Sequence, residues 1–301
     1  MRLSFYIIPT MYHPLPYKKP KPFPGTTFFL FLISALTILQ IFFSISVTAQ
    51  GNLMVMPRRV IFEGPKRYEE LNLANTGKDT ARYVISLTHL RMNDNGGFEL
   101  ISQPDSGENF ADTFVRFFPH SVLLGPNESQ TVKIQLTKIN QMVPGEYRSH
   151  IYFRAIPNQQ PLGDNTPSRD SGISMHIVAV FGLSIPLIIR VGPSTTRVAI
   201  SDPSLQMTTD GTPLLEMTFY RTGNMSIYGD ISVDYTPLKG KKVHAGDAKG
   251  LAVYTPNQLR HIKINLDKLR GVNYHGGKLH IKYFTPGLRI QPIAEKELVL
   301  P

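Results

Sequence analysis

Residues 129–153 read SQTVKIQLTKINQMVPGEYRSHIYF, and this stretch decides the fold class. The apolar residues Val132, Ile134 and Leu136 alternate with polar ones, the period of two that is typical of a half-buried strand. A Pro-Gly turn then precedes a second apolar run, which continues through Phe153. Two short runs of this kind, joined through turn residues, indicate a sheet rather than a helical bundle.

The same alternation continues on both sides of this stretch. Runs with period two lie at 60–63, 70–73, 83–88, 197–200, 214–220, 226–235, 251–254, 261–266, 278–284 and 296–300. Turn residues separate the runs, and Asn93–Gly97 (NDNGG) is a strong hairpin signal because Asn and Gly accept positive φ. Gly145-Glu146-Tyr147 resembles a tyrosine corner, in which the phenol bonds back to the backbone near the end of a sandwich. These features predict an all-β chain of β-sandwiches, and an open barrel is the less favoured alternative.

Length and composition fit two immunoglobulin-like sandwiches in tandem. The chain has 301 residues, of which 42% are hydrophobic and 18% charged, so wholesale disorder is excluded. Gly192-Pro193 breaks the pattern between the two halves. We therefore expect an N-terminal sandwich at 50–191 and a C-terminal sandwich at 192–301.

The first 49 residues read as an export signal. Four basic residues precede the apolar run FFLFLISALTILQIFFSISV at 28–47, and Val47-Thr48-Ala49 supplies the small residues of a cleavage site. The run is nearly long enough to span a bilayer, so an uncleaved inner-membrane anchor is the alternative. Met11 is an alternative start. In either case we expect the body of the protein to lie in the periplasm.

Charge and composition exclude several functions. The net charge is +10, and without the four basic residues of the signal 28 basic and 22 acidic residues remain, a net charge of +6. These charges are spread along the chain, which argues against nucleic acid as a partner. The chain has no Cys, so thiolate metal sites and Cys nucleophiles are excluded. The His residues lack metal-binding spacing, and no G-x-S-x-G or P-loop motif occurs, so we expect no enzyme activity, metal, cofactor or small-molecule substrate.

The longest apolar run after the signal is Ile173–Val191, ISMHIVAVFGLSIPLIIRV. It follows a polar stretch at 158–172 that we expect to be a mobile loop. The run is apolar at both parities, which fits a strand buried on both faces. The other interpretation is an edge strand that presents apolar side chains to a partner. Pro186 favours the edge, because proline cannot donate to a strand ladder.

Several segments together resemble the PapD-like periplasmic pilus-assembly chaperones. They are PRRVIFEG at 57–64, LNLANTG at 71–77, FFP at 117–119 followed by VLLGPNESQ at 122–130, PGEYR at 144–148 and IPLIIR at 185–190. The resemblance covers 55–191 with similar spacing. The second half resembles the family only in its size, β character and position.

The resemblance implies strand donation. Members of this family bind pilus or fimbrial subunits, which are sandwiches without their last strand, before an outer-membrane usher receives them. The chaperone lends its G1 strand, so the resemblance places Ile177, Ala179, Phe181 and Leu183 in the gap of the subunit. Residues of the opposite parity are then expected to pack into the chaperone's own core.

The resemblance also implies a carboxylate anchor. In this family an Arg on the first strand and a Lys on G1 bind the terminal carboxylate of the subunit. Arg59 aligns with that Arg, and Arg58 is an alternative. The position of the Lys falls at Pro186, and no Lys is near it. Arg190 matches an Arg at the end of G1 that is expected to lie between the domains.

Two hypotheses remain open. One is a periplasmic chaperone that completes fimbrial subunits, and the lack of Cys argues against the disulfide-bearing branch of that family. The other is a two-domain immunoglobulin-like structural or adhesive protein of the cell envelope, without chaperone activity. A solvated strand position is the corresponding alternative for Arg59. The hypotheses differ in what they require of the edge formed by Ile173–Val191.

Overall fold

The computed structural model describes residues 53–104, 106–156, 180–269, 271–286 and 292–301. Their regular elements are strands, apart from two short 3-10 turns, η1 (Asp112–Phe114) and η2 (Ile139–Gln141). The all-β prediction is therefore confirmed. The expected export signal at 1–49 lies outside the described residues. Among those residues, no helix is long and apolar enough to cross a membrane.

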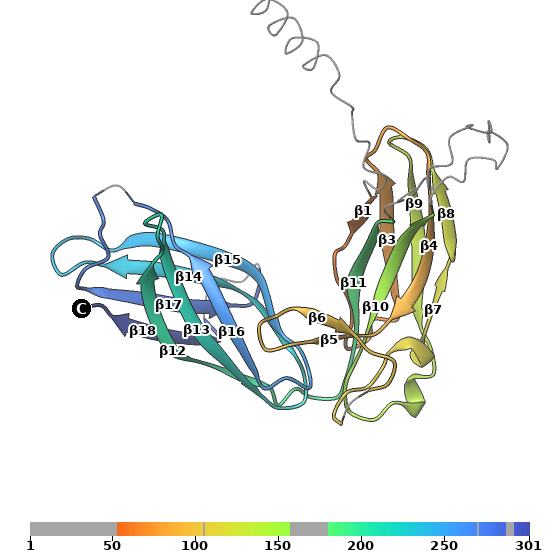
Figure 1. Cartoon of the computed structure of the whole chain (residues 1–301). Helices are drawn as coiled ribbons and strands as arrows, with labels where there is room; N and C mark the ends of the chain where they lie inside the picture. The colour runs from red at the N-terminus through yellow and green to blue at the C-terminus, as the bar shows by residue number, and fades with distance from the viewer. Residues whose placement is uncertain (1–52, 105, 157–179, 270, 287–291) are drawn as a thin grey trace, which may run out of the picture. The chain divides into compact units, whose positions relative to one another are not determined.

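Two facing sheets form the first sandwich (Figure 1). One sheet has the order β1 (Leu53–Met56), β3 (Tyr68–Asn75), β9 (Ser129–Leu136) and β7 (Val115–Phe118). The other has the order β2 (Val60–Phe62), β11 (Gly182–Val191), β10 (Gly145–Ile156), β4 (Ala81–Thr88) and β8 (Ser121–Leu124). The neighbouring strands are antiparallel except β2 and β11, which run parallel.

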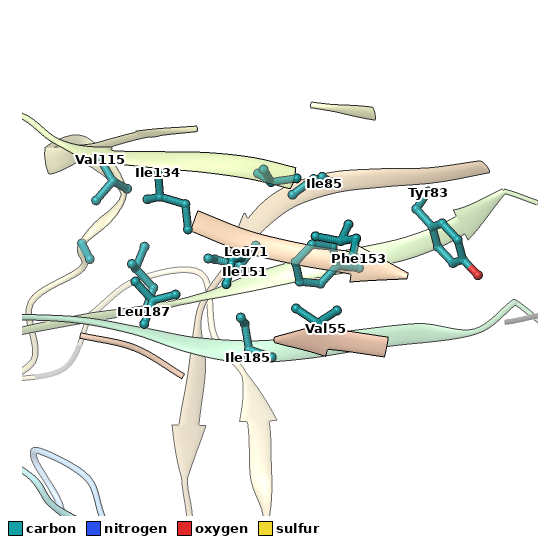
Figure 2. Close-up of a cluster of buried hydrophobic side chains, with 14 of the residues drawn as sticks. Val55, Leu71, Tyr83, Ile85, Val115, Ile134, Ile151, Phe153, Ile185 and Leu187 are labelled. Carbon is teal, nitrogen blue, oxygen red and sulfur yellow. The ribbon is translucent and has the colours of Figure 1, made fainter. Parts of the chain in front are cut away.

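Alternate side chains of the two sheets fill the core of the first sandwich. Figure 2 shows Leu71 and Ile134 from one sheet beside Ile151, Phe153 and Leu187 from the other. All five are at most 1% exposed. Burial of each such side chain contributes about 1.5–3 kcal/mol. The predicted alternation in β9 is confirmed, because its apolar residues are the buried ones.

The tyrosine corner is also confirmed. Tyr147 is buried, and its Oη accepts a bond from the Val143 amide at 2.9 Å and donates to the Val143 carbonyl at 3.2 Å. The ring of Phe114 packs edge-on against Tyr147 at 5.1 Å. These contacts fix the start of β10 against the end of the sandwich.

Replacing Tyr147 with Phe is expected to lower the free energy of unfolding by about 1–2 kcal/mol, because the ring stays in place while both hydrogen bonds are lost. Urea denaturation followed by circular dichroism measures the change. Tyr68→Phe is the control, since Tyr68 is exposed and should tolerate the change within about 0.5 kcal/mol. Equal effects of the two substitutions would show that the corner contributes nothing.

A second pair of sheets forms the second sandwich. One has the order β12 (Arg197–Met207), β13 (Pro213–Thr222) and β16 (Leu259–Asn265), and the other β15 (Val243–Val253), β14 (Ile227–Thr236), β17 (Lys278–Phe284) and β18 (Ala294–Val299). They enclose a core of their own around Phe219 and Tyr283. The last strand of the first sandwich ends at Val191, and the first strand of the second begins at Arg197. The domain division at 191/192 remains a prediction. Contacts group 50–301 into one unit.

The hairpin predicted at Asn93–Gly97 joins β5 (Leu90–Met92) to β6 (Phe98–Leu100). The Asn93 amide donates to the Gly97 carbonyl at 2.8 Å, and Gly96 has a φ of +83°. The same turn contacts the second sandwich, where the His261 amide donates to the Asp94 carbonyl at 2.7 Å. The hairpin therefore links the two sandwiches.

Candidate functional site: the open edge of β11 and the adjoining pocket

β11 is covered on one side along its whole length and on the other side only in part. It pairs with β10 from Gly182 to Val191, whereas β2 pairs only with Leu187–Ile189. Within the described residues, Gly182–Pro186 therefore has no strand on the side away from β10. We call this segment the open edge.

The backbone of the open edge points outward at alternate residues. The Ala155 amide donates to the Phe181 carbonyl at 2.9 Å, so the backbone carbonyl of Phe181 points toward β10. Successive residues of a strand direct their backbone groups to opposite sides. The backbone groups of Gly182, Ser184 and Pro186 therefore point away from β10. Pro186 therefore stands where its missing N–H leaves no gap in the ladder with β10, as the sequence predicted for an edge strand.

Apolar side chains are exposed where the open edge begins. Val180, Phe181 and Leu183 are 50%, 45% and 39% exposed, respectively. Ile177 and Ala179, the other two residues expected to enter a partner, lie outside the described residues. Phe181 and Leu183 belong to the alternate residues that the resemblance places in the gap of a subunit. That role remains a prediction.

The expectation for the opposite parity is wrong over the described part of β11. Ile185, Leu187 and Ile189, which share the parity of Phe181, fill the core of the first sandwich. Ile188 packs instead with Ala252 and Tyr254, in the second sandwich. When both faces of a strand are apolar, alternation does not reveal which face meets which core.

On the even face of the open edge, Tyr152 lies across Gly182. A Cβ added at Gly182 would come within 2.2 Å of the Tyr152 hydroxyl. A larger residue at position 182 would have to displace the Tyr152 ring. Residues that share the parity of Phe181 fill the core of the first sandwich from Ile185 onward, whereas Tyr152 of β10 packs over the other face at Gly182.

Arg59 lies at the end of the open edge. It precedes β2, and since Val60 pairs in parallel with Leu187, Arg59 aligns with Pro186. Its Nη1 donates to Tyr254 Oη at 2.7 Å, and its guanidinium lies 4.2 Å from the centre of the Tyr228 ring. Cation–π contact at this distance is favourable. Arg59 is therefore half-buried and held by aromatic side chains. The alternative interpretation, a solvated strand residue, does not describe these contacts.

The guanidinium of Arg59 is not fully satisfied. Its Nε and Nη2 are buried without a hydrogen-bond partner in the described part of the chain. The same part of the chain gives Arg59 no ion pair. A half-buried cation with unpaired donors is costly, and an anion bound there would lower that cost.

A pocket of about 760 Å³ adjoins Arg59. Three arginines line it, Arg59, Arg190 and Arg197, together with hydroxyl side chains such as Thr196 and Ser226. Its described lining contains no Asp or Glu. Arg58, the alternative anchor, is exposed and is not part of this lining. The pocket is thus suited to an anion.

Arg190 contacts residues of both sandwiches. Its Nε donates to Glu146 Oε2 at 3.2 Å and its Nη2 to the Ser226 carbonyl at 2.8 Å. Its Nη1 also lies 3.6 Å from the carboxylate of Glu63. The guanidinium of Arg190 is therefore already bound by groups of the protein. Its expected role in setting the angle between domains remains a prediction.

Positive charge accumulates behind Arg59. Arg148 is buried, pairs with Glu108 at 3.1 Å and lies 4.7 Å from the centre of the Tyr254 ring. Burial lowers the pKa of its guanidinium, against the attraction of Glu108. Burial, followed by the charges of Arg148 and Arg59, lowers the pKa of His150 to about 3. The burial and positive charge around Arg59 therefore disfavour protonation of His150.

Sequence reasoning found Arg59, the edge and Arg190, but missed their partners. Tyr228, Tyr254 and Arg197 belong to the second half of the chain, where no motif was recognised. Glu146 lay inside the quoted PGEYR segment, and an acidic residue at the start of a largely buried strand was a usable signal. The described residues hold no group of three or more His, Asp or Glu side chains placed to bind a metal ion.

No protein-family model matches the chain, and no curated protein matches it. Many solved structures do match, among them several chaperones, one of which is the class 5 fimbriae chaperone CfaA. The YadV chaperone is 14% identical with a TM-score of 0.41, over 83% of this chain and 100% of that chain. A structure of the CsuC–CsuE chaperone–tip adhesion subunit pre-assembly complex from Acinetobacter baumannii is 13% identical with a TM-score of 0.38, over 83% and 98%.

A PapD-like domain of human CEP192 is 14% identical with a TM-score of 0.28, over 46% of this chain and 83% of that domain. All these likenesses concern the fold. Identities this low say nothing about what the chain binds, which is inferred below from its own residues.

Proposed function

We propose that this chain is a periplasmic chaperone for pilus or fimbrial subunits. It binds an incomplete subunit by donating its β11 edge as the missing strand, and then hands the subunit to an outer-membrane usher. The observation that carries the proposal is the open edge of Gly182–Pro186, with Phe181 and Leu183 exposed at its start. The periplasmic location rests on the expected export signal at 1–49.

An uncovered apolar edge is a liability unless a partner covers it, because it can pair with any other strand. Edges of the second sandwich carry the usual protection. β12 contains Pro203 and an irregular register between Ser201 and Ser204, and β18 exposes three successive charged residues, Glu295–Glu297. The open edge of β11 carries one such feature, Pro186 at its end, while Gly182–Ile185 has no charged residue, no proline and no register shift. This difference supports strand addition as its purpose.

The geometry also supports a direction for the added strand. β2 runs parallel to β11 and begins where the open edge ends. A partner strand in line with β2, and parallel to β11, would arrive at Pro186 with its C-terminal end. Its terminal carboxylate would then meet Arg59, whose Nε and Nη2 form the side of a guanidinium that donates two parallel bonds.

The proposed partners are therefore pilin-like subunits whose last strand is missing, and an usher. Phe181 and Leu183, with Ile177 and Ala179 before them, would enter the groove of the subunit. No cofactor, nucleic acid or small-molecule substrate takes part. The competing function is a structural or adhesive protein of the cell envelope, which needs no free edge.

Charge introduced at the open edge tests the proposal. Phe181→Glu and Leu183→Glu are each expected to reduce one-to-one recovery of a co-expressed pilin-like subunit at least tenfold, because a carboxylate would have to enter an apolar groove. Leu123→Glu is the matched control. Leu123 is 52% exposed on β8, the opposite edge of the same sheet, and should leave recovery unchanged.

Circular dichroism and urea unfolding of each variant establish that the sandwich remains folded. Recovery equal to that of the unmodified chain in both edge variants would show that strand donation is wrong. The structural or adhesive function would then be preferred.

A further inference from the structure

One end of the second sandwich combines exposed apolar and basic side chains. β14 contacts Arg59 through Tyr228 at its start and ends at Thr236, so its ten residues span about 30 Å. The loop 237–242, with the sequence PLKGKK, follows at the end away from Arg59. We call this loop, together with residues 299–301, the far tip, and Figure 1 shows the C-terminus there.

Two large apolar side chains are exposed at the far tip. Leu238 is 81% exposed, more than any other large apolar side chain of the described residues, and Val299 is 76% exposed. Both lie at one end of the same sheet, because Thr236 and Val299 pair with Lys278 of β17. A Cβ added at Gly276 would come within 2.6 Å of Leu238 Cδ1, so Leu238 rests on the backbone of the neighbouring loop.

Uncompensated positive charge surrounds these apolar side chains. Lys239 and Lys241 are exposed, and neither has an ion pair within the part of the chain that the structure describes. Lys242 pairs with Asp234 at 3.1 Å, but the same carboxylate lies 3.7 Å from Lys282. The neighbouring charges are the balanced pairs Lys268–Asp210 and Lys278–Glu297, and the carboxylate of Asp267. The far tip therefore keeps an excess of positive charge.

We propose that the far tip docks on an anionic lipid surface. Leu238 enters the boundary between headgroups and acyl chains, and Lys239 and Lys241 pair with lipid phosphates. An exposed apolar side chain among cations has both properties that interfacial binding requires.

A lipid surface suits the far tip better than a folded acidic protein does. A stable protein–protein interface buries about 800 Å² on each partner, which is more than a six-residue projecting loop offers. A fluid lipid surface needs no matching pocket for Leu238. Docking at this end leaves the open edge of β11, in the first sandwich, uncovered, and the proposal does not rest on the proposed function.

A single fluorescent reporter tests the docking. The chain has no Trp, so Leu238→Trp in the full chain places one indole at the far tip. We expect its emission to shift to shorter wavelength with vesicles of equal parts phosphatidylglycerol and phosphatidylcholine, and to stay unchanged with phosphatidylcholine alone. In about 1 M NaCl, where the Debye length is about 3 Å, the shift should be largely lost.

Removal of charge tests the part played by the lysines. Lys239→Gln with Lys241→Gln, in the Leu238→Trp chain, should weaken vesicle binding about thirtyfold, as expected for two cations near an anionic surface. Lys78→Gln with Lys133→Gln is the control, since it removes the same charge from exposed positions of the first sandwich. This control should leave binding unchanged.

A second reporter position shows whether the contact is local. Leu123→Trp places the indole on β8 of the first sandwich, where Leu123 is 52% exposed, and should give no shift. Val299→Trp gives another reporter at the far tip if the circular dichroism of Leu238→Trp differs from that of the unmodified chain.

Four results would overturn the proposal. They are an unchanged emission from the far tip with anionic vesicles, an equal shift with phosphatidylcholine alone, an equal shift from Leu123→Trp, and equal weakening by the two pairs of Lys→Gln substitutions. A shift produced by poly-aspartate but not by vesicles would also overturn it, and would assign the far tip to an acidic polypeptide.

Discussion

Replacing Glu146 with Ala is expected to lower the free energy of unfolding by about 3–5 kcal/mol, because it leaves a buried charge network without its anion. The Glu146 side chain is fully buried, and its carboxylate accepts bonds from the Ser226 amide at 3.0 Å and from Arg190 Nε at 3.2 Å. The Ser226 hydroxyl donates to it as well, at 2.5 Å. Alanine would strand a guanidinium and a buried N–H at once.

Glu63→Ala provides the matched control for this prediction. Glu63 faces the same guanidinium of Arg190 at 3.6 Å, but its side chain is 61% exposed. Solvent screening should limit the effect to about 1 kcal/mol or less. Guanidinium chloride unfolding at pH 7, followed by circular dichroism, compares the two variants. Equal and small effects would mean that Glu146 does not hold the network together.

The fold was accessible from sequence because alternation and turn chemistry agree along most of the chain. β9 and the turn at Asn93–Gly97 are examples, since their side chains lie as the pattern requires. The first half of β15, Val243–Lys249, was not predicted. Its pairing with β14 shifts register twice, and such irregularities interrupt the period of two on which the prediction depended.

The site was only partly accessible, because its contacts join distant parts of the chain. Arg59 could be placed beside Pro186 from the resemblance, but Tyr254, which accepts its hydrogen bond, lies 195 residues further on. The parity error in β11 has a similar cause. Ile188 is as apolar as Ile189, and only the tertiary structure shows that one meets the second sandwich and the other the first core.

His150 should make the protein less stable in mild acid. Its side chain is buried in β10, its Nδ1 has no partner in the described residues, and its pKa is lowered from 6.5 to about 3. Burial is the largest cause, followed by the charges of Arg148, Arg59 and His89. In the unfolded chain the same imidazole takes up a proton near pH 6.5. The unfolded state therefore binds more protons as the pH falls.

The sign follows from this difference. The stability contribution is fully present above about pH 6.5 and is lost progressively as the pH falls toward 3, at about 1.4 kcal/mol per pH unit. Between pH 7.5 and 5.0 the loss from His150 is about 2 kcal/mol. His150→Gln removes the titrating group, so its free energy of unfolding should change by that much less over the same interval.

Urea unfolding at pH 7.5 and 5.0 measures this difference directly, because other titrating groups affect the unmodified chain and the variant alike. His275→Gln is the control, since His275 is exposed and its loss should preserve the pH dependence of the unmodified chain. A His150→Gln variant that loses as much stability as the unmodified chain would contradict the prediction. The cations that disfavour His150 protonation include Arg59, so an anion bound at Arg59 should reduce the same acid sensitivity.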